Sequence, residues 1–236
     1  MPRTDKLAAF TSGEIDTLLS GFLNVDGQMK RHDQTHRYAS FDHCYVYFRQ
    51  FASESTRGRF LEPENIELAC LQLGFYLASW GMYRGSTDLL QRSGMALVPI
   101  LEYLATADIN LWNLDVPEYT QDSIEMLMAF YCNFYKILDQ LKISPTATLR
   151  TKILLGTMGN IPAFDNYFAR ATGAWKPTPK FLSRLREFHH VHKDTLEKRV
   201  VRCRAFAAKE SSMHHYPMAK MLDMIFFQKA LGPSAR

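Results

Sequence analysis

The sequence predicts an all-α fold, a compact multi-helix domain that spans residues 1–236. Apolar residues recur at helical spacing along most of the chain, and capping residues or prolines stand where many of these segments begin. Alternating strand patterns are scarce, and no repeat of solenoid length is visible. The chain is 47% hydrophobic, which supplies a substantial core and argues against disorder.

Helix-start signals divide the N-terminal half. Residues 11–14 (Thr-Ser-Gly-Glu) match a capping-box pattern, and apolar residues follow them on one face as far as Leu23. Pro63 opens another helix, which runs toward Trp80 and is then interrupted by two glycines. The expected helices cover residues 11–23, 38–51, 63–80, a short stretch after Ser86 and about 96–107, before a loop at 108–119 that is rich in Asn, Asp and Pro.

The C-terminal half contains a long apolar segment and is then divided by prolines. Pro145 precedes one helix, Pro162 and Pro217 each open another, and Pro177 and Pro179 mark a bend. Two of the later segments are rich in Lys and Arg. The expected helices cover residues 121–141, 148–155, a stretch from Pro162, then 181–192, about 195–208 and a last one from Pro217.

The net charge of +4 conceals an uneven distribution. Residues 142–209 carry 14 Lys or Arg and 4 Asp or Glu, a local balance of 14 − 4 = +10, which leaves 4 − 10 = −6 for the rest of the chain. An acidic N-terminal half beside a basic C-terminal half indicates a surface for a polyanion such as DNA. Ordinary solvated helix surface is the alternative.

The chain is expected to be soluble, cytoplasmic and monomeric. No apolar run is long enough to span a bilayer, and the N-terminus lacks the apolar core of a secretory signal. The four cysteines are far apart and form no C-x-x-C pair, so we expect reduced thiols and no zinc site. We expect no metal and no cofactor.

The most informative segment is Leu149–Arg170, with the sequence LRTKILLGTMGNIPAFDNYFAR. Its glycines would let a phosphodiester approach the backbone closely, because no Cβ obstructs it. A helix beginning at Pro162 would add free N–H groups and the positive end of its dipole. The residues expected to contact a DNA backbone are Gly156, Gly159, Asn160 and Arg170. Alternatively, Gly156 only ends one helix and Pro162 only begins the next.

One carboxylate lies within this basic segment. Asp165 falls in the first turn of the expected helix, between Lys152 and Arg170. A carboxylate beside a nucleic-acid strand stabilises the positive charge that a sugar develops as its base departs, so Asp165 is the candidate catalytic residue. Lys152 is the second candidate, as an amine nucleophile if its pKa is depressed and otherwise as a phosphate contact. Alternatively, Asp165 only complements the helix dipole.

This segment resembles the helix–hairpin–helix DNA glycosylases, in which a glycine hairpin binds DNA backbone and an aspartate performs catalysis. Residues 162–165 (Pro-Ala-Phe-Asp) are similar to the Pro-x-Asp-type stretch of that family, and Gly156 and Gly159 would match the hairpin glycines. Arg170 resembles a basic residue often found shortly after the aspartate. Two residues rather than one separate the glycines here, the aspartate follows sooner, and the match covers about a tenth of the chain.

The resemblance implies a helical fold, DNA as the partner and hydrolysis of the N-glycosidic bond of a modified or damaged base. Some glycosylases similar to this class act in antiviral defence, by removing sugar-modified cytosines from phage DNA. The resemblance extends to that substrate as a hypothesis.

A base that leaves the DNA stack needs an aromatic or apolar pocket. Trp80, Tyr83 and Arg84 surround a glycine-broken helix end and offer two flat faces and a planar cation. Asp42 lies in an aromatic segment and is the fourth residue expected in this base pocket. Alternatively, Trp80 and Tyr83 pack in the core at a helix end, and Asp42 faces solvent.

Three other functions fit the sequence. A non-catalytic nucleic-acid-binding module would bind in a salt-sensitive way without releasing a base. A protein–protein scaffold would show no affinity for a polyanion. An RNase would use His189 or His192 as acid or base, since Arg184 and His189 stand in an R-x-x-x-x-H spacing.

Overall fold

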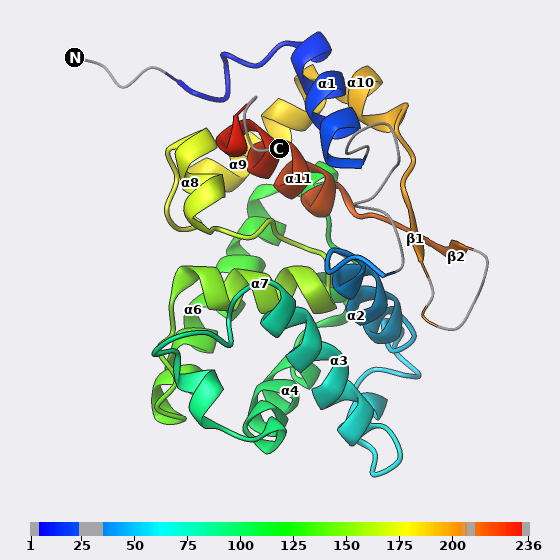
Figure 1. Ribbon diagram of the computed structural model, residues 1–236, viewed down its shortest axis with the longest axis vertical. Helices are drawn as coiled ribbons and strands as arrows, with labels where there is room; N and C mark the ends of the chain where they lie inside the picture. The colour runs from blue at the N-terminus through cyan, green and yellow to red at the C-terminus, as the bar shows by residue number, and fades with distance from the viewer. Residues whose placement is uncertain (1–4, 24–34, 205, 207–210, 233–236) are drawn as a thin grey trace.

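A computed structural model describes residues 5–23, 35–204, 206 and 211–232 (Figure 1). The α-helices are α1 (Ser12–Leu23), α2 (Ala39–Arg49), α3 (Ile66–Ser79), α4 (Val98–Ala105), α5 (Ile109–Asn113), α6 (Gln121–Gln140), α7 (Ala147–Thr157), α8 (Asn166–Thr172), α9 (Pro179–Val191), α10 (Lys193–Glu197) and α11 (Met218–Leu231). The described residues also form the short 3-10 helices η2 (Arg59–Leu61), η3 (Asp88–Gln91), η4 (Gly94–Leu97) and η5 (Val116–Glu118). Helices thus dominate the described residues, as the sequence predicts.

The helices fall into two groups that share one core. Figure 1 shows α1, α8, α9, α10 and α11 toward one end of the molecule and α2, α3, α4, α6 and α7 toward the other. In the first group α11 packs against α1 and α8, and in the second α2 packs against α3 and α7. Buried side chains of both groups, including Leu19, Phe48, Leu154 and Phe226, belong to one apolar cluster.

Helix α7 lies in the interior, and every residue from Leu149 to Thr157 is buried. Its polar side chains find partners inside the fold: the guanidinium of Arg150 donates to the carbonyl of Tyr131 at 2.8 Å. A Cβ added to Gly156 would lie 2.3 Å from Cε1 of Tyr76, so α7 and α3 require a glycine where they touch. Gly156 therefore lies within α7 and does not end it.

The helix expected from Pro162 begins only at Asn166. The N–H groups of the intervening residues are taken by side chains from other elements. The N–H of Ala163 donates to Asp223 at 3.3 Å, and that of Phe164 donates to Thr151 Oγ1 at 2.9 Å. These tertiary hydrogen bonds engage N–H groups that a helix starting at Pro162 would have left free for a ligand.

The prediction of a second basic helix at about 195–208 is wrong. Helix α10 ends at Glu197, and β1 (Arg202–Arg204) then pairs antiparallel with β2 (Ser211–His215). Strand β1 packs on α2, and the N–H of Tyr216 donates to the carbonyl of Val201 at 2.8 Å. Residues 205, 207 and 208 of that predicted helix lie outside the described residues.

Two smaller findings complete the fold. The loop expected at 108–119 contains the short helices α5 and η5. A search of the described residues for a helix with the length and apolar character of a membrane span finds none.

Candidate active site

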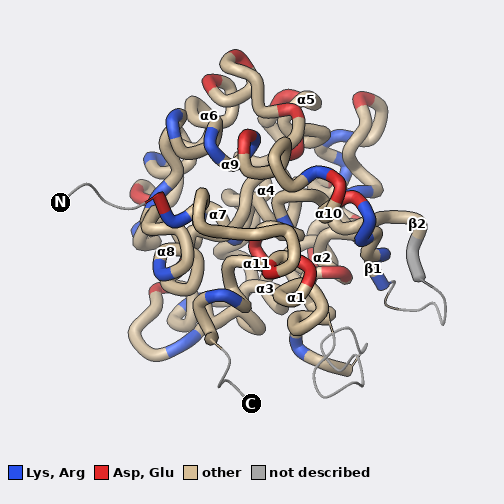
Figure 2. Tube along the Cα trace, turned by 90° about the horizontal axis from the view of Figure 1, so that it is seen from above, with Lys and Arg blue, Asp and Glu red and all other residues tan. Residues whose placement is uncertain are grey.

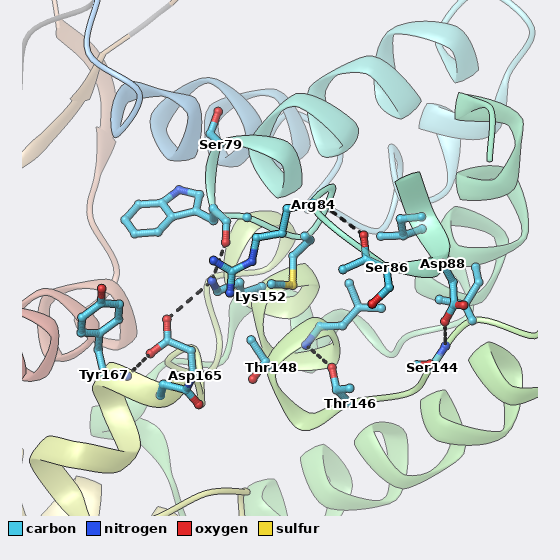
Figure 3. A pocket seen from close by; sticks show the side chains of 18 of the residues that line it. Ser79, Arg84, Ser86, Asp88, Ser144, Thr146, Thr148, Lys152, Asp165 and Tyr167 are labelled. Carbon is cyan, nitrogen blue, oxygen red and sulfur yellow. Dashed lines mark hydrogen bonds and ion pairs between the residues drawn. The ribbon is translucent and has the colours of Figure 1, made fainter. Parts of the chain in front are cut away.

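A cavity of about 500 Å³ lies where the end of α3, the first turns of α7 and the start of α8 meet (Figure 3). Cavities of this size bind small molecules in other proteins. The predicted residues that line it are Trp80, Arg84, Lys152 and Asp165. Its other polar side chains are Arg37, Ser79, Ser86, Thr87, Asp88, Ser144, Thr146, Thr148, Asn166 and Tyr167.

Asp165 is the N-cap of α8 and is held in one orientation. Its Oδ1 atom accepts hydrogen bonds from the N–H groups of Tyr167 at 2.9 Å and Phe168 at 3.0 Å. Its Oδ2 atom lies 3.5 Å from Nζ of Lys152, and the side chain is 17% exposed. The helix therefore uses one oxygen, and Lys152 approaches the other at the edge of the cavity.

Lys152 is the buried cation of the cavity. It lies in α7 with its side chain 6% exposed, and Nζ donates to the carbonyl of Trp80 at 2.9 Å. Burial lowers the pKa of Lys152 below its usual value, and the carboxylates of Asp165 and Asp223 oppose that shift. The direction of the shift is the one that the nucleophile hypothesis requires.

Aromatic side chains form the wall beside Lys152. Trp80 follows the last residue of α3, and its ring centroid lies 5.0 Å from that of Tyr38 and 6.1 Å from that of Phe227. Nζ of Lys152 lies 5.7 Å from the Trp80 ring centroid. Trp80 therefore lines the cavity and packs against the core at once, as both interpretations of this residue expected.

Two buried charges behind the cavity were not predicted. Lys220 and Asp223, on α11, are 2% and 9% exposed, and Nζ lies 2.9 Å from Oδ2. Nζ of Lys220 also lies 4.6 Å from the Trp80 ring centroid. Lys152, Asp165, Lys220 and Asp223 form a charged quartet, because the charges of the α11 pair act on the pKa of Lys152. The available signal was an opposite-charge pair three residues apart in an otherwise apolar helix.

The structure corrects the predicted phosphate-binding turn. A Cβ at Gly159 would lie 2.6 Å from Cε2 of Tyr45, and that at Gly156 would collide with Tyr76. Asn160 is fully buried and its Nδ2 donates to the carbonyl of Leu111 at 2.9 Å. These three residues serve close packing in the interior, so their backbone is closed to a phosphodiester.

Three further predicted residues lie away from the cavity lining. Tyr83 packs against the core. Asp42 is 1% exposed, and its carboxylate accepts hydrogen bonds from the hydroxyl of Tyr216 and the N–H of Arg204, so it faces neither a pocket nor solvent. Arg170 is exposed on α8 and remains accessible to a DNA backbone.

Part of the basic charge is neutralised within the fold. Arg184 pairs with Asp5, and Arg199 pairs with Asp16 at 2.8 Å. Figure 2 shows Lys and Arg interspersed with Asp and Glu along the trace, including around α10. Lys209, which belongs to the basic segment, lies outside the described residues. The charge on the surface of the described residues is therefore distributed more evenly than the composition suggests.

The RNase hypothesis finds little support in the geometry. His189 and His192 are 5% and 8% exposed, and burial lowers the pKa of both rings. Arg184, the arginine of that pattern, forms an ion pair with Asp5. Within the described ranges, no three His, Cys, Asp or Glu side chains come together in a way that would hold a metal ion.

The resemblance to helix–hairpin–helix glycosylases depends on residues 149–170, and its hairpin glycines are buried. The catalytic-residue part of that resemblance stays a prediction. Comparisons with protein-family models, curated proteins and solved structures find no match to this chain.

Proposed function

We propose that the chain is a DNA glycosylase that hydrolyses the N-glycosidic bond of a modified or damaged base. The observation that carries this proposal is the oriented carboxylate of Asp165 at the edge of a cavity of about 500 Å³. A target nucleotide extruded from the DNA stack would enter that cavity, with its base against the Trp80 wall.

Asp165 would act on the sugar. As the base departs with the electron pair of the glycosidic bond, positive charge develops on the ring oxygen and C1′. A carboxylate that is already oriented stabilises this charge without reorganisation, and it directs a water molecule to C1′. Lys152 would hold the second carboxylate oxygen in place through the 3.5 Å contact.

Lys152 has a second possible role in the same reaction. A deprotonated amine would attack C1′ in place of water, lose a proton and form an imine with the opened sugar. Burial of Lys152 favours the neutral amine. Borohydride reduction traps such an imine as a covalent protein–DNA adduct, whereas hydrolysis by water leaves none.

The cavity suits a base that carries a bulky substituent. Its volume falls within the range of sites that enclose a whole small molecule, which is more than an unmodified base requires. Hydroxyl groups of Ser86, Thr146 and Thr148 line it and match the polar surface of a sugar substituent. Sugar-modified cytosine, as in phage DNA, is therefore the substrate that we would test first, with antiviral defence as the corresponding role.

Base release from defined duplexes tests the proposal. We expect Asp165→Asn to lower kcat by about 10²–10³, the loss typical when one preorganised electrostatic group is removed. Asparagine is as good an N-cap as aspartate, so α8 should remain folded. Asp139→Asn, at an exposed position of α6, is the matched control and should release bases at the wild-type rate.

Two outcomes would contradict the proposal. Equal release by wild type and Asp165→Asn would remove Asp165 from catalysis. Salt-sensitive DNA binding without release of any base would favour the non-catalytic binding module instead.

A further inference from the structure

Within the part of the chain that the structure describes, Arg84 is a cation of the cavity without an anionic partner. Its residue is exposed, and Figure 3 shows its side chain turned into the cavity toward the end of Lys152. Among the described residues, no ion pair or hydrogen bond engages its guanidinium. A guanidinium that faces a cavity and is not neutralised there is suited to binding an anionic ligand.

The Arg84 side chain lies beside a glycine of the same turn. Gly81 has a φ of 78°, and its missing Cβ would lie 3.5 Å from Nε and 3.6 Å from Cζ of Arg84. The guanidinium therefore lies against bare backbone. The N–H of Arg84 donates to Thr87 Oγ1 at 3.1 Å, and the N–H of Thr87 donates back to the Arg84 carbonyl at 3.1 Å. These two hydrogen bonds fix the backbone at Arg84 beside the cavity.

The two carboxylates of the cavity lining make other contacts and are outnumbered by its cations. Asp165 is engaged by Lys152 and by two N–H groups of α8. Asp88 accepts a hydrogen bond from the N–H of Ser144 at 2.7 Å. Arg37 adds a second guanidinium to the lining, with Cζ 5.1 Å from the Tyr38 ring centroid. Three cationic side chains against two carboxylates leave the lining with an excess of positive charge.

We propose that Arg84 binds a phosphate group of the nucleotide that occupies the cavity. This inference rests on the proposed function and deepens it, because it assigns the ligand as a phosphate ester and not a neutral nucleoside. Two parallel N–H groups of a guanidinium match two phosphate oxygens, and the hydroxyls of Ser86 and Thr87 stand in the same lining as further donors. The phosphate belongs either to the DNA backbone or to a free nucleotide.

Calorimetric titration with small probes tests the site without any chemistry. We expect deoxycytidine 5′-monophosphate or 3′-monophosphate to bind the wild type about tenfold or more tightly than deoxycytidine, as a charge-assisted hydrogen-bonded contact implies. Arg84→Gln should abolish that preference, so that the monophosphates and deoxycytidine bind this variant with similar affinity. Arg84→Lys should restore part of it, because it keeps the charge without the two-pronged geometry.

Arg186→Gln is the matched control, since Arg186 is exposed on α9 and does not line the cavity. It should bind all three probes as the wild type does. Equal binding of nucleoside and monophosphates to the wild type would overturn the inference, and so would a phosphate preference that survives in Arg84→Gln. A short single-stranded oligonucleotide, compared with the monophosphates, shows whether the phosphate comes from DNA or from a free nucleotide.

Failure of this inference and failure of the proposed function give different results. If duplexes release a base and Asp165→Asn lowers kcat, but Arg84→Gln has the wild-type KM, the phosphate site is wrong and the glycosylase proposal stands. If no duplex releases a base but the monophosphates bind in an Arg84-dependent way, the phosphate site stands and the glycosylase proposal is wrong.

Discussion

Asp42 and Tyr216 form a buried pair whose ionisation is coupled to folding. The Tyr216 hydroxyl donates to Oδ1 of Asp42, and the N–H of Arg204 donates to Oδ2 at 2.8 Å. Burial is the larger influence and raises the pKa of Asp42 from 3.8 to about 6, while both hydrogen bonds oppose it. Because the folded-state pKa is the higher one, Asp42 contributes stability at low pH that is lost as the pH rises from about 4 to about 6.

We expect Tyr216→Phe to raise the pKa of Asp42 further, because the ionised carboxylate loses a hydrogen bond that stabilises it. Carboxyl-carbon NMR across the titration measures the midpoint directly. Tyr135→Phe, at an exposed position of α6, should leave that midpoint at the wild-type value. An unchanged or lower midpoint in the Tyr216 variant would show that the hydroxyl does not support the charge.

The structure brings together two charged side chains that the sequence singled out, and it gives two predicted glycines a different role. Asp165 and Lys152 were each predicted as candidate catalytic residues, and the structure places their charged atoms 3.5 Å apart. Gly156 and Gly159 were also selected, but for the wrong reason. A glycine that admits a phosphate and a glycine that admits a tyrosine ring have the same sequence signature, because both only require the absence of a Cβ. The choice depends on what lies opposite, which is tertiary information.

At the scale of elements, the N-terminus of α11 is capped by a residue far away in the sequence. Asp115 precedes η5, and its carboxylate accepts hydrogen bonds from the N–H groups of Val116 at 2.7 Å, Ala219 at 2.9 Å and Met218. These bonds use both oxygens of the carboxylate. The N-cap residue of α11, Pro217, makes no side-chain capping bond, so Asp115 supplies what the local sequence lacks.

We expect Asp115→Asn to lower the free energy of unfolding by about 1–3 kcal/mol, because its amide would turn a donor toward the N–H of Met218. Urea unfolding at neutral pH measures the loss. Asp108→Asn is the matched control, since Asp108 caps α5 through a single hydrogen bond to Asn110 and asparagine replaces that function. If both variants are equally stable, Asp115 does not act as the cap of α11.

Elements with local signals were predicted well, and elements determined by distant contacts were not. The capping pattern and apolar face of residues 11–23 correspond to α1, and the long apolar segment at 121–141 corresponds to α6. The helix expected from Pro162 begins only at Asn166, and in the segment expected as a helix at 195–208, α10 ends at Glu197 and β1 follows. In both segments the backbone hydrogen bonds go to residues such as Asp223, Thr151 and Asp42, which no local pattern identifies.

At the scale of the whole molecule, the cavity is assembled from segments that the sequence keeps far apart. Trp80 and Arg84 come from the segment that follows α3, Lys152 from α7 and Asp165 from the start of α8. Trp80 and Arg84 were predicted as part of a base pocket, and Lys152 and Asp165 as catalytic residues. The fold brings all four to one cavity. The α11 charges behind that cavity went unpredicted, because periodicity places an isolated Lys–Asp pair on the solvent side of a helix.

Burying the charged quartet lowers the stability of the fold, because its side chains lose their contacts with water. The Lys220–Asp223 pair is deeply buried, and Nζ of Lys220 lies 4.9 Å from the Phe41 ring centroid. Burial raises the pKa of Asp223, whereas the positive charges of Lys220 and Lys152 lower it. Each charge is therefore tolerated only because the opposite charge is present, and removing one should cost more than removing both.

We expect Lys220→Met to lower the free energy of unfolding by about 3–5 kcal/mol at neutral pH, the cost of leaving a buried carboxylate unpaired. The double variant Lys220→Met/Asp223→Asn should lose clearly less, since the asparagine is neutral and still accepts the N–H of Ala163. Lowering the pH should restore stability to the single variant alone, because protonation removes the unpaired charge of Asp223.

The matched control is Arg59–Glu62, an exposed ion pair with the same three-residue spacing. The two single variants and the double variant of this pair should show no comparable coupling energy. A double variant as unstable as Lys220→Met would mean that the side-chain packing of Lys220, and not its charge, supports α11 behind the cavity.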